Sequence, residues 1–175
     1  MSRVVRAAII AVVVLPALPY ILGFLLPATT QARASVMLHA PPAAVFAVVA
    51  DVEHMPAWVA SMTALAAVAA DDGRPTWEEQ RTDGETVRYA LVSAHAPSTT
   101  VAGRVELSAR SVDGRFGANW ITSISAAAGG TRVDVEQETF MHGALARFFL
   151  LVSGGSRAAA QGYVDALAAA PGVRG

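Results

Sequence analysis

Residues 117–138 read GANWITSISAAAGGTRVDVEQE, and this stretch decides the fold. After the pair Gly129-Gly130 the residue type alternates. One face takes Thr131, Val133, Val135, Gln137 and Thr139, and the other takes Arg132, Asp134, Glu136 and Glu138. A period of two with one apolar and one charged face is typical of a strand in an antiparallel sheet whose other face meets water. The stretch therefore predicts a hairpin within such a sheet.

Turn signals divide the chain after Leu65 into further strands. They are Asp71-Asp72-Gly73-Arg74-Pro75, Asp83-Gly84, Ala96-Pro97-Ser98, Asp113-Gly114 and Gly129-Gly130. Asp83-Gly84 is the sharpest, because a two-residue hairpin turn requires positive φ at both central positions. Five turns separate six strands, and the short run from Ser35 to His39 adds one before them. We expect a sheet of about seven strands.

Two segments have helical spacing instead. Val45, Phe46, Val49 and Val52 recur three and four residues apart, as a helix that buries one face requires. The C-terminal segment repeats this pattern with Leu145, Phe148, Phe149, Val152, Ala159, Tyr163 and Leu167. It predicts one long amphipathic helix over the inner face of the sheet. Gly154-Gly155-Ser156 lies in its middle, and since each glycine costs about 1 kcal/mol in a helix, we expect either a kink or a close approach to the sheet there.

The N-terminal segment is apolar all round. Residues 7–26 read AAIIAVVVLPALPYILGFLL, without a charge, and twenty residues at about 1.5 Å each match a bilayer core of about 30 Å. Arg3 and Arg6 precede the segment and only Arg33 follows closely, which places the N-terminus in the cytoplasm. The sequence thus predicts a single-pass protein of the cytoplasmic membrane, with its C-terminal domain on the extracytoplasmic side.

A cleaved secretory signal is the alternative, since Ala32-Arg33-Ala34 fits the small-x-small rule. The apolar run is longer than the usual 7–15 residues or so of a signal, and a cut after Ala34 would trim the first strand. We therefore favour an uncleaved anchor. The expected division is a cytoplasmic N-terminus (1–6), a transmembrane helix (7–27), a linker (28–34), one domain (35–170) and a frayed tail (171–175).

Composition excludes several kinds of chemistry. The chain has no cysteine, which removes disulfides, thiolate catalysis and cysteine zinc sites. Its 13 basic residues, all arginine, balance 14 acidic ones, and a net charge of −1 predicts no nucleic-acid partner. The histidines at 39, 54, 95 and 142 show no metal-ligand spacing, and no serine lies in a G-x-S-x-G motif. We expect no metal and no cofactor.

One carboxylate is a candidate catalytic residue. Glu78 and Glu79 are adjacent, so on a strand their side chains lie on opposite faces. Glu79 shares its face with Trp77 and Arg81, and a carboxylate in an apolar pocket could act as a general base. The alternative is a surface carboxylate paired with an arginine, with no catalytic role.

Two stretches resemble a known superfamily. APPAAVFAVVADVEHMPAW (Ala40 to Trp58) is similar to the opening of the SRPBCC or START-like superfamily, also called Bet v 1-like: a strand ending in Ala-Pro, a helix with valine and an aromatic residue, then Asp and Pro-x-Trp. Gly117 to Glu138 resembles its closing hairpin, with a Trp on the outgoing strand and Gly-Gly-Thr-Arg at the turn. The polyketide cyclase/dehydrase-like subgroup is nearest, and the resemblance covers residues 35–170.

The resemblance implies an α+β helix-grip fold. In this fold a curved antiparallel sheet of about seven strands wraps around the long C-terminal helix and encloses an apolar cavity for a lipid, sterol or polyketide. The candidate cavity residues are Trp77, Tyr89, Trp120, Gln137, Thr139 and Phe148. For the aromatic residues, packing in the core is the alternative.

Three functions are compatible with these observations. The leading hypothesis is a membrane-anchored binding or carrier protein for a hydrophobic small molecule, such as a lipid, polyketide or isoprenoid-like compound. The first alternative is a cyclase or dehydratase that orients a polyketide-like substrate while one buried acid or histidine moves a proton. The second alternative is a structural envelope module with a filled core, which predicts no cavity large enough for a ligand.

Overall fold

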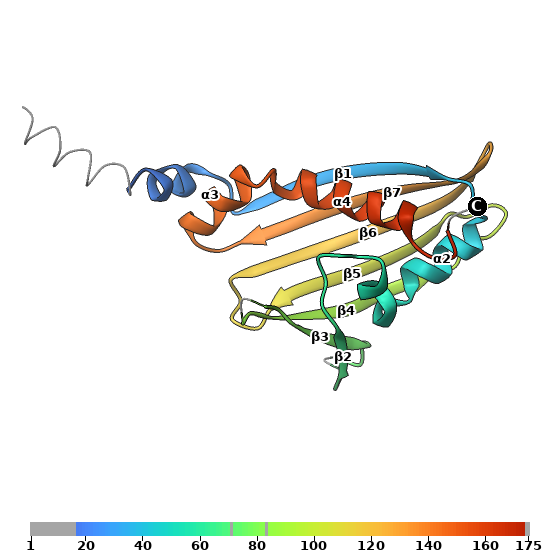
Figure 1. Cartoon of the computed structure of the whole chain (residues 1–175), viewed down its shortest axis with the longest axis horizontal. Helices are drawn as coiled ribbons and strands as arrows, with labels where there is room; N and C mark the ends of the chain where they lie inside the picture. The colour runs from blue at the N-terminus through green and yellow to red at the C-terminus, as the bar shows by residue number, and fades with distance from the viewer. Residues whose placement is uncertain (1–16, 71, 83, 174–175) are drawn as a thin grey trace, which may run out of the picture.

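The computed structural model describes residues 17–70, 72–82 and 84–173. Its elements in chain order are β1 (Thr29–Leu38), α2 (Pro42–Ala50), the 3-10 helix η1 (Val52–Ala57), β2 (Leu65–Val68), β3 (Thr76–Gln80), β4 (Thr86–His95), β5 (Gly103–Ser111), β6 (Phe116–Ala127), β7 (Gly130–Met141), α3 (Ala144–Val152) and α4 (Gly155–Ala169). The strands form one curved sheet (Figure 1). This confirms the expected α+β helix-grip fold.

The sheet has seven strands in the order β1-β7-β6-β5-β4-β3-β2, and every neighbouring pair is antiparallel. Consecutive strands from β2 to β7 are neighbours, so each is joined to the next by a turn. The first strand instead pairs with the last, and α2 and η1 lead the chain from that edge to the opposite one. On β7 the residues from Thr131 to Thr139 alternate as predicted, with Val133 and Val135 buried and Arg132 and Glu136 exposed.

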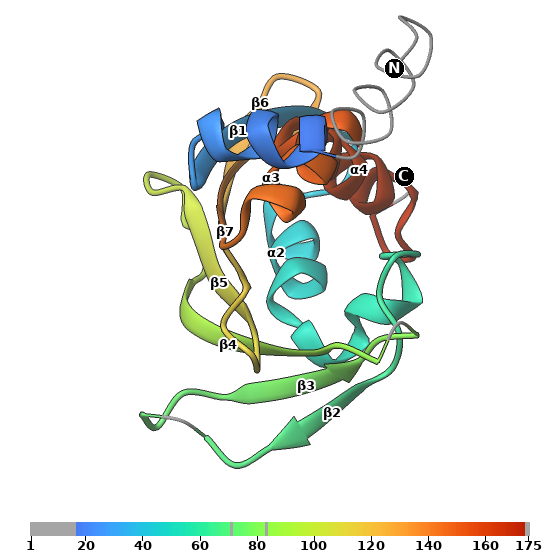
Figure 2. The ribbon, with the colours of Figure 1, turned by 90° about the vertical axis from the view of Figure 1, so that its left-hand side faces the viewer.

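Helices fill the concave side of the sheet (Figure 2). α4 packs mainly over β1 and β7, and α2 over β5 and β6. The core that they enclose is rich in valine, which comes from the inner face of the sheet and from both helices. Its most buried members include Val45, Val49, Val133, Val164 and Leu167, each at most 2% exposed.

The C-terminal segment places a long helix, α4, over the sheet as predicted, but the predicted stripe from Leu145 to Val152 forms a separate, shorter helix, α3. Gly154 and Gly155 take left-handed φ values of 90° and 64°, which glycine adopts without a steric penalty, and the helix axis is interrupted there. α4 buries five residues, whereas no residue of α3 is buried. The spacing of apolar residues predicts an apolar face on each helix. It could not reveal that only the apolar face of α4 packs on the sheet.

Both ends of the predicted domain need correction. β1 begins at Thr29, so most of the expected linker 28–34 is strand, with Arg33 in an ion pair to Glu136 at 3.0 Å. At the other end, Val173 is 2% exposed and packs in the core, so the described part of the expected frayed tail is ordered against α2 and α4. Both segments are rich in polar and small residues, so their sequences gave no apolar pattern from which these contacts could be predicted.

The N-terminal prediction is also corrected. Residues 1–16, which include the expected cytoplasmic N-terminus and the first half of the 7–27 helix, lie outside the described residues, and 17–25 form a helix. In the described part of the chain, no helix is both long enough and apolar enough to span a bilayer. This finding contradicts the predicted single-pass location in the cytoplasmic membrane, and the predicted membrane contact through 7–27 has no support.

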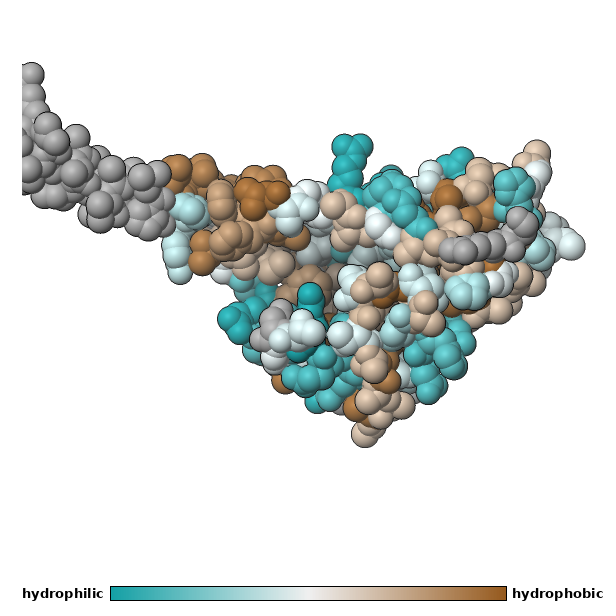
Figure 3. Space-filling view, in the orientation of Figure 1, coloured by the Kyte–Doolittle hydropathy of each residue, from teal (hydrophilic) through white to brown (hydrophobic). Residues whose placement is uncertain are grey.

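Apolar side chains gather on the surface where the helix 17–25 meets α3 (Figure 3). The exposed ones there include Phe24, Leu25, Phe149, Leu151 and Val152. The two segments lie close together: a Cβ on Gly23 would overlap the Ala144 carbonyl, and Arg147 donates to the Leu26 carbonyl at 3.3 Å.

Candidate functional site

A cavity of about 420 Å³ lies between the sheet and α4. Its wall is mostly apolar and comprises Val49, Met55, Val59, Ser61, Met62, Arg81, Tyr89, Val105, Leu107, Ala109, Phe116, Trp120, Thr122, Ala158, Ala159, Gly162 and Tyr163. α4 packs mainly over β1 and β7, so it does not fill the space beside it over the middle strands, and the cavity lies there. Small residues on both sides, Ala109 on β5 and Ala158, Ala159 and Gly162 on α4, widen the space.

One end of the cavity is aromatic. The ring centroid of Tyr163 lies 5.3 Å from that of Trp58 and 5.3 Å from that of Trp120. Tyr163 is buried, and this burial raises the pKa of its hydroxyl to about 12. The hydroxyl therefore stays neutral at any physiological pH, and this wall offers rings and a neutral hydroxyl to a ligand.

Glu79 lies behind the wall, in a closed hydrogen-bond network. It is 2% exposed, and its Oε1 accepts hydrogen bonds from the backbone N–H of Thr63 at 2.7 Å and from the Thr63 hydroxyl at 3.2 Å. Its Oε2 accepts one from the Tyr89 hydroxyl at 2.8 Å. Burial, followed by this bond, raises the pKa of Tyr89. The arginine-paired carboxylate of this strand is Glu78, whose partner is Arg88 at 2.6 Å.

The cavity candidates divide into two groups. Tyr89 and Trp120 lie on the wall. The others lie elsewhere: Trp77 packs half-buried on β3, Gln137 and Thr139 are buried on β7, and Phe148 stacks on Phe149 in α3. Gln137 donates to Thr139 at 3.0 Å, and its Oε1 has no partner among the described residues.

Several wall residues were not among the sequence candidates. The sequence pattern predicts Tyr163 only as part of the buried face of a helix. It predicts Arg81 only as a residue on the same strand face as Glu79. Met55 and Met62 come from η1 and the loop after it, where no periodic pattern indicates which side chains face inward. The alternation of side chains along β5 could predict Leu107 and Ala109, since both lie on the same face of the strand as the buried Val105.

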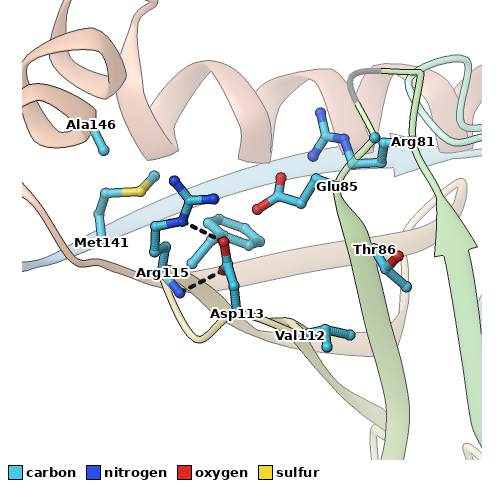
Figure 4. A pocket seen from close by; sticks show the side chains of 10 residues that line it. Arg81, Glu85, Thr86, Val112, Asp113, Arg115, Met141 and Ala146 are labelled. Carbon is cyan, nitrogen blue, oxygen red and sulfur yellow. Dashed lines mark hydrogen bonds and ion pairs between the residues drawn. The ribbon is translucent and has the colours of Figure 1, made fainter.

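A second pocket, here called the vestibule, adjoins the cavity (Figure 4). It measures about 760 Å³ and is formed by the β3–β4 turn, the β5–β6 turn and the start of α3. Arg115 and Asp113 form an ion pair there, and hydrogen bonds from Arg115 and Ser111 lower the pKa of Asp113 to about 2. Arg81 and Phe116 belong to both walls, so they mark the junction.

Across residues 17–70, 72–82 and 84–173, no three histidine, aspartate or glutamate side chains come together in a way that could hold an ion. The cavity chemistry is therefore that of its apolar surface, its tyrosines and Arg81.

Solved structures of similar shape are known. Ara h 8.0201 is 17% identical with a TM-score of 0.50, covering 78% of this chain and 97% of its own. TTHA0849 from Thermus thermophilus is 19% identical with a TM-score of 0.56 (80% and 95% covered). The Zhui aromatase/cyclase from Streptomyces sp. R1128 is 9% identical with a TM-score of 0.56 (81% and 92% covered). At these identities the likeness shows the fold alone.

Sequence comparison is more specific. None of the curated proteins matches the chain. The profile of the family described as polyketide cyclase/dehydrase and lipid transport, however, matches residues 29–170, from the first residue of β1 to the end of α4. Because this match spans most of the chain, the protein belongs to the polyketide cyclase/dehydrase and lipid transport family.

Proposed function

We propose that this protein binds a hydrophobic small molecule in the cavity under α4 and shields it from water. The observation that carries the proposal is the cavity itself, an apolar space of about 420 Å³ inside a single small domain. Ligand pockets typically measure about 300–1,000 Å³ and are lined by apolar and aromatic side chains with a few polar groups. The envelope-module alternative predicted a filled core, and this cavity argues against it.

The affinity would come from burial of apolar surface. Each Å² removed from water contributes about 25 cal/mol before the entropic costs of association. Trp120 and Tyr163 supply rigid aromatic area, and Met55 and Met62 supply flexible side chains that adapt to ligand shape. Such a wall favours a broad class of apolar ligands, in agreement with a family whose description includes lipid transport.

A cyclase or dehydratase is the second candidate, and the pair Glu79 and Tyr89 favours it. Tyr89 lies on the wall and is bonded to a buried carboxylate, an arrangement that could transfer a proton. Binding remains the better supported function, because both oxygens of Glu79 are already occupied. Among the wall residues that the structure describes, no carboxylate or imidazole faces the cavity.

A blocking variant tests the binding function. Ala109→Leu adds a branched side chain to the cavity wall, and Ala66→Leu makes the same change at an exposed position of β2. We expect native mass spectrometry of the full chain, purified from its source, to show an apolar adduct on the wild type and on Ala66→Leu. Ala109→Leu should carry none while unfolding at a similar temperature.

Other outcomes separate the alternatives. If wild type and Ala109→Leu are both free of adduct, and neither changes its tryptophan fluorescence on titration with decanol, the binding proposal fails. For the enzyme, Glu79→Gln should abolish turnover of a polyketide-like substrate while ligand binding persists. An unchanged rate would remove Glu79 from the mechanism.

A further inference from the structure

We propose that Arg81 binds an anionic oxygen group, carboxylate or phosphate, at one end of the ligand, so that the ligand is an amphipathic acid. Its charged end would lie at the junction of cavity and vestibule, and its apolar body would extend under α4 towards Tyr163. This inference rests on the proposed function and specifies the ligand class of the same site.

The position of Arg81 carries the first step. It follows the last residue of β3, and the turn after it is held by two backbone bonds: the Arg81 N–H donates to Glu85 at 2.9 Å, and Gly84 N–H donates to the Arg81 carbonyl at 3.0 Å. Its side chain lines both the cavity and the vestibule. A charged donor group therefore lies where the apolar space opens.

The second step is that the Arg81 guanidinium has no hydrogen bond or ion pair to any side chain in the described ranges. Other arginines nearby are neutralised: Arg115 by Asp113, and Arg88 by Glu78. A guanidinium offers five N–H donors and no acceptor, and its planar fork matches a carboxylate or a phosphate. Figure 4 shows Arg81 extending along the vestibule near Glu85. Glu85 lines the vestibule but not the cavity, and among the described residues of the cavity wall Arg81 has no carboxylate beside it.

The third step concerns the other polar groups of the cavity. The Tyr89 hydroxyl already donates to Glu79, so it can offer a ligand only its lone pairs. Tyr163 and Thr122 offer neutral hydroxyls, which are weaker donors than a charged guanidinium. Arg81 is thus the strongest donor to a ligand acceptor among the described wall residues, and it would set the direction in which the ligand lies.

The test compares three ligands that carry the same ten-carbon alkyl chain: undecanoic acid, decyl phosphate and decanol. Each is titrated into the full chain and followed by tryptophan fluorescence, since Trp120 lies on the wall. We expect the better of the two anions to bind about tenfold more tightly than decanol, which is the scale of one hydrogen bond to a charged group. The tighter anion identifies the end group.

Two variants assign the preference. Arg81→Gln should lose the tenfold preference and keep the decanol affinity. Arg104→Gln removes the same charge from an exposed position of β5 and should keep both. Equal binding of acids and alcohol by the wild type, or a preference that survives in Arg81→Gln, would overturn this inference and leave the cavity function intact. Binding of none of the three ligands would overturn both proposals.

Discussion

The inner face of the sheet has a packed end and a hollow end. At the packed end β1 and β7 meet α4, and Val133, Val164 and Leu167 are fully buried. At the hollow end the same inner face of β4 and β5 borders the cavity with Tyr89, Leu107 and Ala109. Both ends have the same strand alternation, so the difference lies in what covers them.

The coverage depends on where α4 can lie. The left-handed residues Gly154 and Gly155 end α3 and start α4 along β1. From there α4 turns Val164 and Leu167 to the packed end, and Ala158, Ala159 and Gly162 to the hollow end. One helix thus provides large side chains for the core and small ones for the cavity. We therefore expect the packed end to supply most of the stability of the fold. Residues at the hollow end should tolerate substitution and should determine which ligand binds.

Replacing a leucine by alanine at the packed end should have the largest effect on stability, and the same replacement at the hollow end should have a smaller one. Leu167→Ala removes a fully buried side chain and should lower the free energy of unfolding by about 2–5 kcal/mol. Leu107→Ala removes a side chain that already borders a cavity on one side, so we expect a smaller loss, about 2 kcal/mol, together with altered ligand affinity. Denaturant unfolding of both variants measures the difference. Equal losses would mean that the two ends are packed alike.

Tyr163 belongs to both ends, and its titration should destabilise the fold at alkaline pH. Its pKa is about 12 in the folded chain against 10.0 for an unperturbed tyrosine. The unfolded chain therefore loses this proton first, so stability is fully present below pH 10 and falls as the pH rises towards 12. The expected loss is roughly 3 kcal/mol, and the raised pKa of Tyr89 acts in the same direction.

This pH profile is simple to interpret because the chain has no lysine, leaving tyrosine as the main side chain that titrates in the range. The free energy of unfolding is measured as a function of pH, with tyrosinate absorbance as the direct readout. Tyr163→Phe should reduce the loss. A profile that is flat up to pH 12 would show that the hydroxyl is more accessible than its burial indicates.

Sequence reasoning succeeded where a repeating pattern reports directly on exposure. The alternation around Val133 and Val135 identified the inner face, and the turn signals separated the strands. It placed Trp77 and Gln137 on the inner face as well, and they pair across strands with Tyr89 and Trp120. The cavity, however, spans only the middle of the sheet.

The sequence could not reveal the tertiary contacts that decide which residues border the cavity. Whether Gln137 or Trp120 borders the cavity depends on where α4 lies, and α4 is positioned by contacts with β1, more than a hundred residues earlier in the chain. Arg81 precedes a polar turn, where an arginine ordinarily faces solvent, so nothing local marks it as part of a pocket. Likewise, the apolar face of α3 reads like that of a buried helix, although it is exposed.

Tyr89→Phe tests the polar network behind the hollow end. The change keeps the ring on the wall but removes the donor to Oε2 of Glu79, which is buried. A buried acceptor that loses a partner costs about 1–3 kcal/mol, and we expect a loss near the lower limit because Thr63 still donates to Oε1. Thermal unfolding measures it. A neutral result would imply that water replaces the lost donor.

Gly162→Ala should produce the smallest effect and the opposite sign. Gly162 lies inside α4 on the cavity wall, and a Cβ there would meet nothing within 4 Å. Alanine in a helix is favoured over glycine by up to about 1 kcal/mol, so the free energy of unfolding should rise while the cavity narrows slightly. Ala159→Gly, at a nearby exposed position on the same wall, should lose a similar amount. If Gly162→Ala instead destabilised the fold, α4 would have to lie closer to the sheet at this position. The cavity would then be smaller than described, and the packed and hollow ends would differ less.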